Sequence, residues 1–322
     1  MPFESQTAAL LAYAWSPRLL IFAYHRIVAE PDDMLHGEVT AAAFDGQVEW
    51  LSKHAAILAL PDAIERWRSG SLPPRAACIT FDDGYASNFD LALPILQRWR
   101  AVATFYIATG FLDGGRMWND TIIEAVRRTD CEEFDLTAHG AGRFTLGISR
   151  PALAGRLLDT LRRLPYAQRE QCVAAIAAQS GVVLPDDLMM SSEQVRQLGR
   201  LGMDLGGHTE THPILARLAA ADALAEIQRG RAKLFDIVGS EPRTFAYPNG
   251  IPDQDYRVEH VDMVRTSGFE AAVTTAFGGV SADDDRFQLP RVIPWEQRAH
   301  AFAWRAAKAS RSPPAARLQR AM

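Results

Sequence analysis

Short apolar runs alternate with stretches of helical period along most of this 322-residue chain. Runs such as 19–24, 76–81 and 101–107 have the length and composition of buried strands, whereas 43–54 has the period of an amphipathic helix. Strands that alternate with helices form βα units, and their strands lie parallel in one sheet. We therefore predict an α/β protein with a mainly parallel sheet, in a chain long enough for one barrel-sized domain.

One of these runs, 76–81, stops abruptly at Asp82, Asp83 and Gly84, which precede Tyr85. This pattern predicts a buried strand whose end delivers two carboxylates into a loop. Adjacent carboxylates repel each other, so one or both need cationic partners to stay ionised, for example a metal for one and an arginine for the other. The ordinary alternative for an isolated Asp-Asp-Gly is a turn with both carboxylates in water.

A second candidate stretch contains His208 and His212, four residues apart, behind the pair Gly206-Gly207. If residues 209–212 form a single helical turn, the two imidazoles share one face. Two imidazoles and a carboxylate from elsewhere make a facial ligand set for a first-row metal, with positions left open. This spacing favours metal binding over two unrelated histidines.

Three stretches together resemble the motifs of the polysaccharide deacetylase (NodB-homology) family of carbohydrate esterases. They are TFDDGY from Thr80, HTETHP from His208 and RTFAYP from Arg243, in the order that the family has. The segment Phe22-Ala23-Tyr24-His25 is similar to the start of one branch, the poly-N-acetylglucosamine deacetylases. The resemblance implies a distorted (β/α) barrel and metal-dependent hydrolysis of N-acetyl or O-acetyl groups on sugars.

The resemblance also implies the metal ligands. They are Asp83, His208 and His212, the second aspartate and the two histidines of the matching motifs. Zn²⁺ is the expected ion, and Co²⁺, Ni²⁺ or Mn²⁺ also suit such a site. The metal would polarise the acetyl carbonyl and activate a water molecule.

The catalytic roles come from the same resemblance. Asp82 is the expected general base, with Arg243 as the counter-charge that orients it. The backbone N–H of Tyr247 is the expected donor to the oxyanion. No histidine occurs in the late segment 288–294, where many family members carry one. We therefore expect His25 to protonate the leaving nitrogen, with a structural role as the alternative.

Three further residues are candidate substrate contacts. Tyr85 follows the aspartates, and Arg291 is expected near the same rim, where it supports Asp82 or binds substrate. Trp118 is expected either to line the sugar cleft or to stand at a helix start.

The chain is expected to divide into a catalytic domain over 1–303, with a helical insertion at about 118–197 that has no clear strand, and a basic tail over 304–322. A net charge of −5 implies no polyanion-binding field, so nucleic acid is not an expected partner. No apolar run approaches the roughly 20 residues of a membrane span. No signal segment is evident at the N-terminus, which leads us to expect a cytoplasmic protein.

The sequence thus predicts a hydrolase that removes N-acetyl groups from an N-acetylated sugar, oligosaccharide or polysaccharide precursor. Two alternatives stay open: a hydrolase of small non-sugar amides with the same fold, and a sugar-binding relative without catalysis. The oligomeric state is not predicted.

Overall fold

A computed structural model describes residues 15, 18–35, 37–147, 149–313 and 315–319. The chain forms two compact units. The larger contains Met1–Pro31, Gly37–Leu112 and Met190–Met322, and the smaller contains Asp32–His36 and Asp113–Met189.

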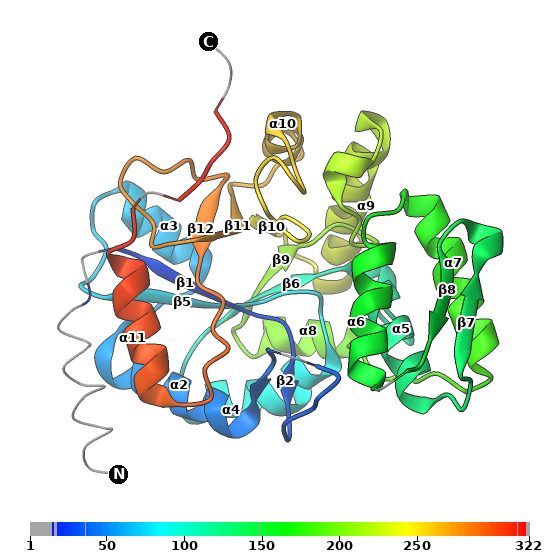
Figure 1. The fold of residues 1–322 in the computed structure, drawn as a ribbon. Coiled ribbons are helices and arrows are strands. Elements are labelled where there is room, and N and C mark those ends of the chain that lie inside the picture. Colours follow the sequence, from blue (N-terminus) through cyan, green and yellow to red (C-terminus); the bar gives the residue numbers. More distant parts are fainter. Residues whose placement is uncertain (1–14, 16–17, 36, 148, 314, 320–322) are drawn as a thin grey trace. The chain divides into compact units, whose positions relative to one another are not determined.

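The larger unit is built on an eight-stranded sheet whose strands pair in parallel (Figure 1). Seven strands follow one another in the order β1-β5-β6-β9-β10-β11-β12, and β4 pairs with the start of β5. The last strand returns to the first, because Phe22 bridges Val292 and Ala23 donates its N–H to Val292 O at 2.9 Å. The result is a nearly closed barrel, as predicted. The strands are β1 (Leu20–Tyr24), β4 (Ala56–Ile57), β5 (Ala76–Phe81), β6 (Thr104–Ile107), β9 (Asp204–Gly207), β10 (Thr244–Ala246), β11 (Ala271–Phe277) and β12 (Leu289–Arg291).

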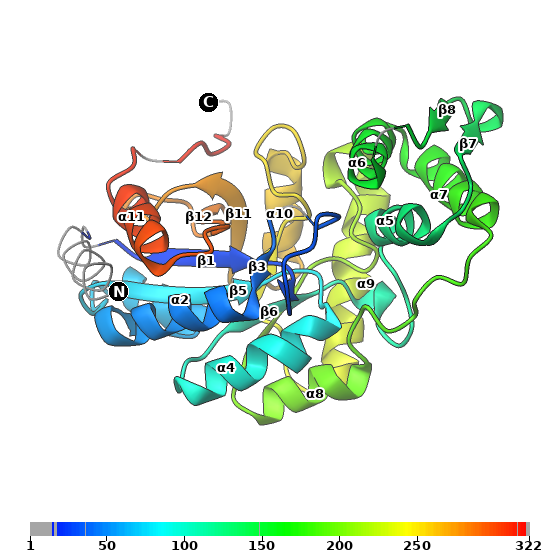
Figure 2. The same cartoon turned by 60° about the horizontal axis from the view of Figure 1, so that its bottom comes forward.

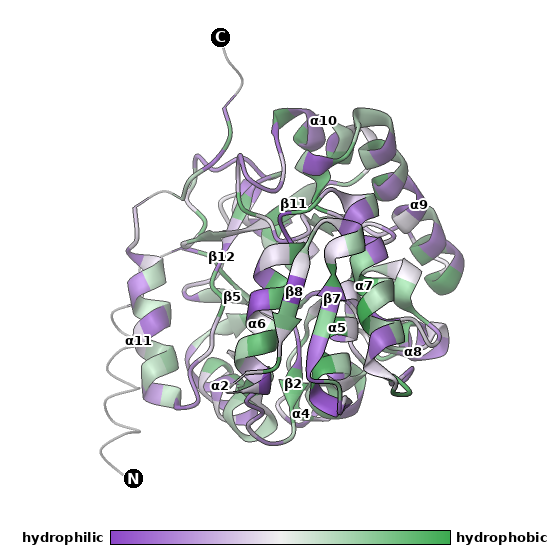
Figure 3. Ribbon diagram, turned by 45° about the vertical axis from the view of Figure 1, so that its right-hand side comes forward, coloured by the Kyte–Doolittle hydropathy of each residue, from purple (hydrophilic) through white to green (hydrophobic). Residues whose placement is uncertain are grey.

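Amphipathic helices surround this sheet (Figures 1 and 2). Their surfaces alternate between hydrophilic and hydrophobic residues (Figure 3). In the part of the chain that the structure describes they are α2 (Ala41–His54), α3 (Leu60–Arg68), α4 (Leu93–Arg98), α8 (Ser192–Arg200), α9 (Ala220–Val238), α10 (Val258–Thr266) and α11 (Ala299–Ser310). Short elements complete the unit: β2 (Ile27–Val28) paired with β3 (Val39–Thr40), the π-helical turn η1 (Asn88–Ala92), and the 3-10 turns η2 (Thr109–Phe111) and η4 (Leu215–Arg217).

Alternation along the strands separates two cores. In β5, Ile79 and Phe81 face outward and pack with residues of α2 and α4, whereas Cys78 faces inward and packs with residues of α3. Thr80 continues the inward row, since successive side chains of a strand point to opposite faces. Asp82 follows two residues later, so the alternation directs its side chain into the mouth of the barrel.

The C-terminal region differs from the predicted tail. Helix α11 spans Ala299–Ser310 and contains the predicted boundary at residue 304. Its residue Phe302 is buried against Phe22 and Trp50, with ring centroids 4.9 and 5.7 Å apart. The many alanines of this segment are therefore a close-packed helix face, whereas Trp304 and Lys308 between them face solvent.

The smaller unit has its own hydrophobic core and contains α5 (Trp118–Arg128), β7 (Glu133–Leu136), the 3-10 turn η3 (Thr137–His139), β8 (Gly142–Thr145), α6 (Arg150–Leu161) and α7 (Tyr166–Ser180). The expectation of no strand here was wrong, because β7 and β8 form an antiparallel hairpin. Across both units, no helix within the described ranges has the length and apolar character needed to cross a bilayer.

Candidate active site

The two aspartates after β5 are buried, which excludes the solvated turn. Asp82 is 2% exposed and Asp83 is 5% exposed. The Asp82 N–H donates to Tyr24 O at 2.9 Å, so β1 still holds the chain at this point. Asp83 and Gly84 then adopt positive φ angles of 76° and 93°. This sharp change of direction sends the two neighbouring carboxylates toward different partners.

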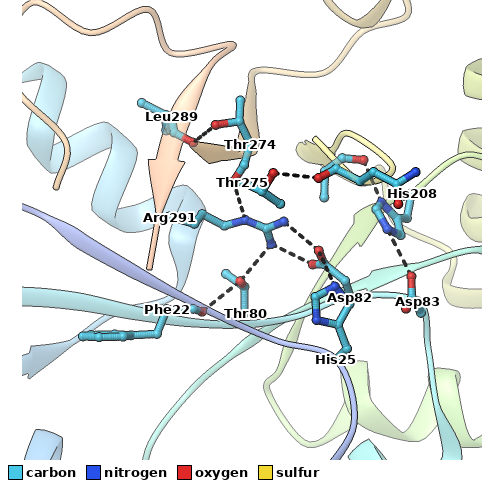
Figure 4. Close-up of polar contacts among 12 residues, drawn as sticks. Phe22, His25, Thr80, Asp82, Asp83, His208, Thr274, Thr275, Leu289 and Arg291 are labelled. Carbon is cyan, nitrogen blue, oxygen red and sulfur yellow. Dashed lines mark hydrogen bonds and ion pairs between the residues drawn. The ribbon is translucent and has the colours of Figure 1, made fainter. Parts of the chain in front are cut away.

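The partner of Asp82 is Arg291, the last residue of β12 (Figure 4). Its two terminal nitrogens donate to Asp82 Oδ1 and Oδ2 at 2.7 and 2.6 Å, and Nε donates to Thr274 O at 2.8 Å. Burial alone would raise the pKa of Asp82, but the charge and hydrogen bonds of Arg291, together with the charges of His208 and His25, outweigh burial and lower it. The Asp82 carboxylate is therefore ionised and fixed in orientation.

Arg243, expected in this role, lies at the opposite end of the barrel. It precedes β10 and makes two hydrogen bonds with Glu270, which precedes β11, at 3.0 and 2.9 Å. Asp82, by contrast, follows the carboxyl end of its strand. In a parallel barrel these ends form opposite rims, so the predicted pair of Arg243 and Asp82 was wrong. Arg291 is the partner of Asp82 instead, and support of Asp82 was one of the two roles expected for it.

Asp83 meets the two histidines. His208 Nε2 lies 3.3 Å and His212 Nε2 3.4 Å from Asp83 Oδ1. The three candidate ligand atoms lie within 4.8 Å of one another. His208 follows β9 directly and is 1% exposed, so the sheet itself fixes its position. The sequence-predicted metal residues thus come together in one cluster.

The chemistry of this cluster fits a cation. His208 Nδ1 lies 2.7 Å from Ala246 O, and because a carbonyl only accepts, Nδ1 carries a proton. The other ring nitrogen, Nε2, faces Asp83 Oδ1, an atom without a hydrogen bond among the described residues. Burial opposes a charge on His208, but Asp83 and Asp82 outweigh burial and raise its pKa, so the space between the ring and the carboxylate favours a positive charge, whether a proton or a metal cation. A hydrogen bond from the second ring nitrogen to a carbonyl is also the usual support of a metal-binding histidine.

The pKa values of the cluster agree with a ligand role for His212. Burial lowers the pKa of His212 to about 4; the charge of Asp83 opposes this shift, and the charges of His208 and His25 add to it. This imidazole is therefore neutral at pH 7 and offers a free lone pair. For Asp83, burial opposes ionisation, but the adjacent histidines lower the pKa of its carboxyl well below the ordinary value.

The backbone between the histidines is not the helical turn that the spacing suggested. Thr209 and His212 both have positive φ angles, 64° and 52°, and the segment contains bends only. The rings nevertheless approach each other, with centroids 4.7 Å apart. The irregular loop thus brings the two imidazole rings together, as one turn of a helix would also have done.

His25 follows β1 and stands at the edge of the same mouth. Its Nε2 lies 3.9 Å from Asp82 Oδ2, and its side chain is 36% exposed where that of Asp82 is 3% exposed. Sequence reasoning missed its neighbour Glu38, whose Oε2 accepts the N–H of Arg26 at 3.2 Å. Burial raises the pKa of Glu38, and the charge of His25 opposes that rise. Glu38 lies in a connecting segment without any motif, so no signal in the sequence indicated it.

The other predicted contacts have different outcomes. Arg291 is fully buried and pairs with Asp82, which is the first of its two expected roles. The Tyr85 ring is 2% exposed, with the Arg26 guanidinium 4.4 Å from its centroid, and its contact with substrate stays a prediction. The N–H of Tyr247 donates to Val273 O at 3.2 Å within the sheet and is not a free oxyanion donor. Trp118 begins α5 in the smaller unit, with the Arg169 guanidinium 4.8 Å from its ring centroid.

Fold and site together define a parallel (β/α) barrel with a candidate metal cluster and an ionised carboxylate at the carboxyl ends of its strands. More narrowly, the chain belongs to the polysaccharide deacetylase family, whose model matches residues 69–270.

Relatives and solved structures are consistent with this family. A poly-β-1,6-N-acetyl-D-glucosamine N-deacetylase of Staphylococcus aureus is 29% identical over 107 residues, which are 31% of this chain and 37% of that protein. The match therefore spans well under half of the relative's length. The structure of IcaB from Ammonifex degensii superposes with a TM-score of 0.58 at 20% identity, over 90% of this chain and 98% of that one. The deacetylase PplD of Streptococcus pyogenes gives 0.58 at 18% identity, over 86% and 92%. At these identities the superpositions establish the fold.

Proposed function

We propose that this protein is a metal-dependent hydrolase that removes N-acetyl groups from an N-acetylated sugar, oligosaccharide or polysaccharide precursor. The observation that carries the proposal is the buried cluster of Asp83, His208 and His212 next to Asp82, a carboxylate that Arg291 keeps ionised. Two imidazoles and a carboxylate suit Zn²⁺, or else Co²⁺, Ni²⁺ or Mn²⁺. A divalent cation held there would polarise the acetyl carbonyl and make water a better nucleophile.

The protein's own groups supply the proton transfers. Asp82 accepts a proton at a carboxylate oxygen as water attacks the amide carbon, and Arg291 keeps that oxygen aimed and charged. His25, 3.9 Å from Asp82 on the more exposed side, gives a proton to the departing nitrogen. The products are acetate and a free amine. The relatives named poly-β-1,6-N-acetyl-D-glucosamine N-deacetylase make oligomers of N-acetylglucosamine the first substrates to assay.

Acetate release from such oligomers tests the proposal. We expect activity in the native protein, loss of activity after chelation and recovery when Zn²⁺ or Co²⁺ is added back. Asp82→Asn should lower the rate at least 100-fold, since general acid–base catalysis contributes about that much or more.

The matched control is Asp236→Asn, at an exposed aspartate of α9, which should leave the rate unchanged. Full activity after complete metal removal would favour a metal-independent amide hydrolase. Sugar binding without acetate release under any of the metals would favour a sugar-binding protein without catalysis.

A further inference from the structure

The loop that carries His212 lies against helix α9, and one buried carboxylate of that helix holds it. Glu226, 7% exposed, accepts the N–H of Glu210 at 3.1 Å and of Thr211 at 2.8 Å, both on Oε2. Its other oxygen, Oε1, accepts the hydroxyl of Thr211 at 2.9 Å. A single side chain thus binds three donors of the loop between the two candidate metal ligands.

Glycines on both sides allow the loop to come this close. One helical turn after Glu226, a Cβ on Gly230 would come within 2.4 Å of the carbonyl carbon of Thr209. A Cβ on Gly110 would come within 2.7 Å of Glu210 O, the same oxygen that accepts the Gly110 N–H at 2.7 Å. The loop backbone is therefore held between α9 and the 3-10 turn at residues 109–111, at distances that only glycine permits.

The loop needs such support because its backbone is strained. Thr209 and His212 have left-handed φ angles of 64° and 52°, which residues with a Cβ rarely adopt. Strained backbone of this kind persists only where the surroundings determine it. The His212 N–H donates to Thr209 Oγ1 at 3.0 Å, so the positions of these two residues are linked directly.

We propose that Glu226 is a positioning residue for the metal site: by holding the backbone of Glu210 and Thr211, it places His212 against His208 and Asp83 and so sets the affinity for the cation. This inference rests on the proposed metal site. What matters is the length of the side chain and its acceptor oxygens. The negative charge of Glu226 is paired with Arg229, a half-exposed residue of the same helix whose Nη2 donates to Oε1 at 3.2 Å. The three loop donors are neutral groups, so we expect the charge to matter less for the loop than the length and the acceptor oxygens.

Two small substitutions separate length from charge. Glu226→Asp keeps the charge but moves the oxygens back by one methylene, whereas Glu226→Gln keeps the length and an acceptor oxygen but removes the charge. We expect the dissociation constant for Zn²⁺, measured by chelator competition, to rise roughly tenfold or more in Glu226→Asp. In Glu226→Gln it should stay within about threefold of the native value.

Two further readouts distinguish positioning from a general loss of stability. The Co²⁺ absorption spectrum should change in Glu226→Asp and not in Glu226→Gln, since the spectrum follows the arrangement of ligands. The melting temperature of the metal-free protein reports stability alone. Glu241→Asp, at an exposed glutamate paired with Arg231 at 2.7 Å, is the matched control and should leave Zn²⁺ affinity unchanged.

The outcomes are separable. A native protein that binds no Zn²⁺ would contradict the proposed metal site itself. Native binding with both Glu226 variants unchanged would contradict only the positioning role. An affinity that is kept in Glu226→Asp and lost in Glu226→Gln would show that charge matters and would also overturn the inference.

Discussion

The positions of the acceptors around Arg291, more than the need for a positive charge, require an arginine at this place. Its guanidinium has three acceptors at fixed positions in the barrel interior: the Asp82 carboxylate, Thr80 Oγ1 and Thr274 O. The planar fork of an arginine matches this arrangement, whereas the ammonium of a lysine carries the same charge without the fork. A buried pair of this kind also needs every partner, because an unpaired charge is costly in the interior.

Arg291→Lys should therefore reduce both stability and activity. We expect the free energy of unfolding, measured by urea denaturation, to fall by about 2 to 4 kcal/mol because charged hydrogen bonds are lost. Acetate release should fall at least tenfold because Asp82 is no longer oriented.

The matched control for this change is Arg243→Lys, in a partly exposed pair with Glu270 at the other rim. It should change the free energy of unfolding by less than about 1 kcal/mol and leave the activity within about twofold. The opposite ranking of the two variants would restore Arg243 as the partner of Asp82 in solution.

Strand β9 connects the two ends of the barrel. It ends at Gly207, directly before His208, and begins at Asp204 near the opposite rim. In its middle, a Cβ on Gly206 would come within 2.4 Å of the Tyr106 ring, so the Tyr106 side chain of the neighbouring strand β6 packs directly over this glycine. At its start, Thr104 donates its hydroxyl to Asp204 Oδ2 at 2.8 Å.

Asp204 should make stability depend on pH. Burial raises its pKa from the ordinary 3.8 to about 6. The folded state therefore binds this proton more tightly than the unfolded state, and the free energy of unfolding falls as the pH rises from about 4 to 6.

Asp204→Asn removes this dependence while keeping an acceptor for Thr104. Between pH 4 and pH 7, the free energy of unfolding of the variant should rise by roughly 1 to 2 kcal/mol relative to that of the native protein. This amount is smaller than the full pKa shift implies, because the side chain is partly exposed. Urea denaturation at several pH values measures it, and the difference between the two proteins cancels all other titrations. Parallel curves would show that Asp204 is ionised at an ordinary pKa.

The placement of the site was predictable from sequence because it depends on local order. An apolar run followed by polar residues identifies a strand end, and parallel strands bring such ends to one rim. Asp82 and Asp83 were found in this way, whereas His208 was found from its spacing to His212, and His25 from the resemblance to one branch of the family. The pairing of Asp82 with Arg291 was offered only as one of two roles, because the two residues lie 209 positions apart and meet only through the closure of the sheet.

Other features gave no distinguishing signal in the sequence. Glu226 occupies one position of an amphipathic helix among other charged residues, and only its contacts with the loop set it apart. Helix α11 resembled a solvated tail, because alanine packs into a core without the bulk that marks a buried helix in sequence. The role of Glu226 and the packing of α11 both depend on contacts between segments that are distant in the sequence.

Helix α11 closes the larger unit where β12 meets β1, and its anchor is Phe302. This side chain is fully buried between Phe22 of β1 and Trp50 of α2, so its removal would leave a cavity at the junction of the first and last parts of the chain. Phe302→Ala should lower the free energy of unfolding by about 3 to 5 kcal/mol, measured by urea denaturation. Trp304→Ala, two residues along the same helix but 57% exposed, should change it by only about 0.5 kcal/mol. If residues beyond 303 were a separate tail and this helix did not pack, both substitutions would have the same small effect.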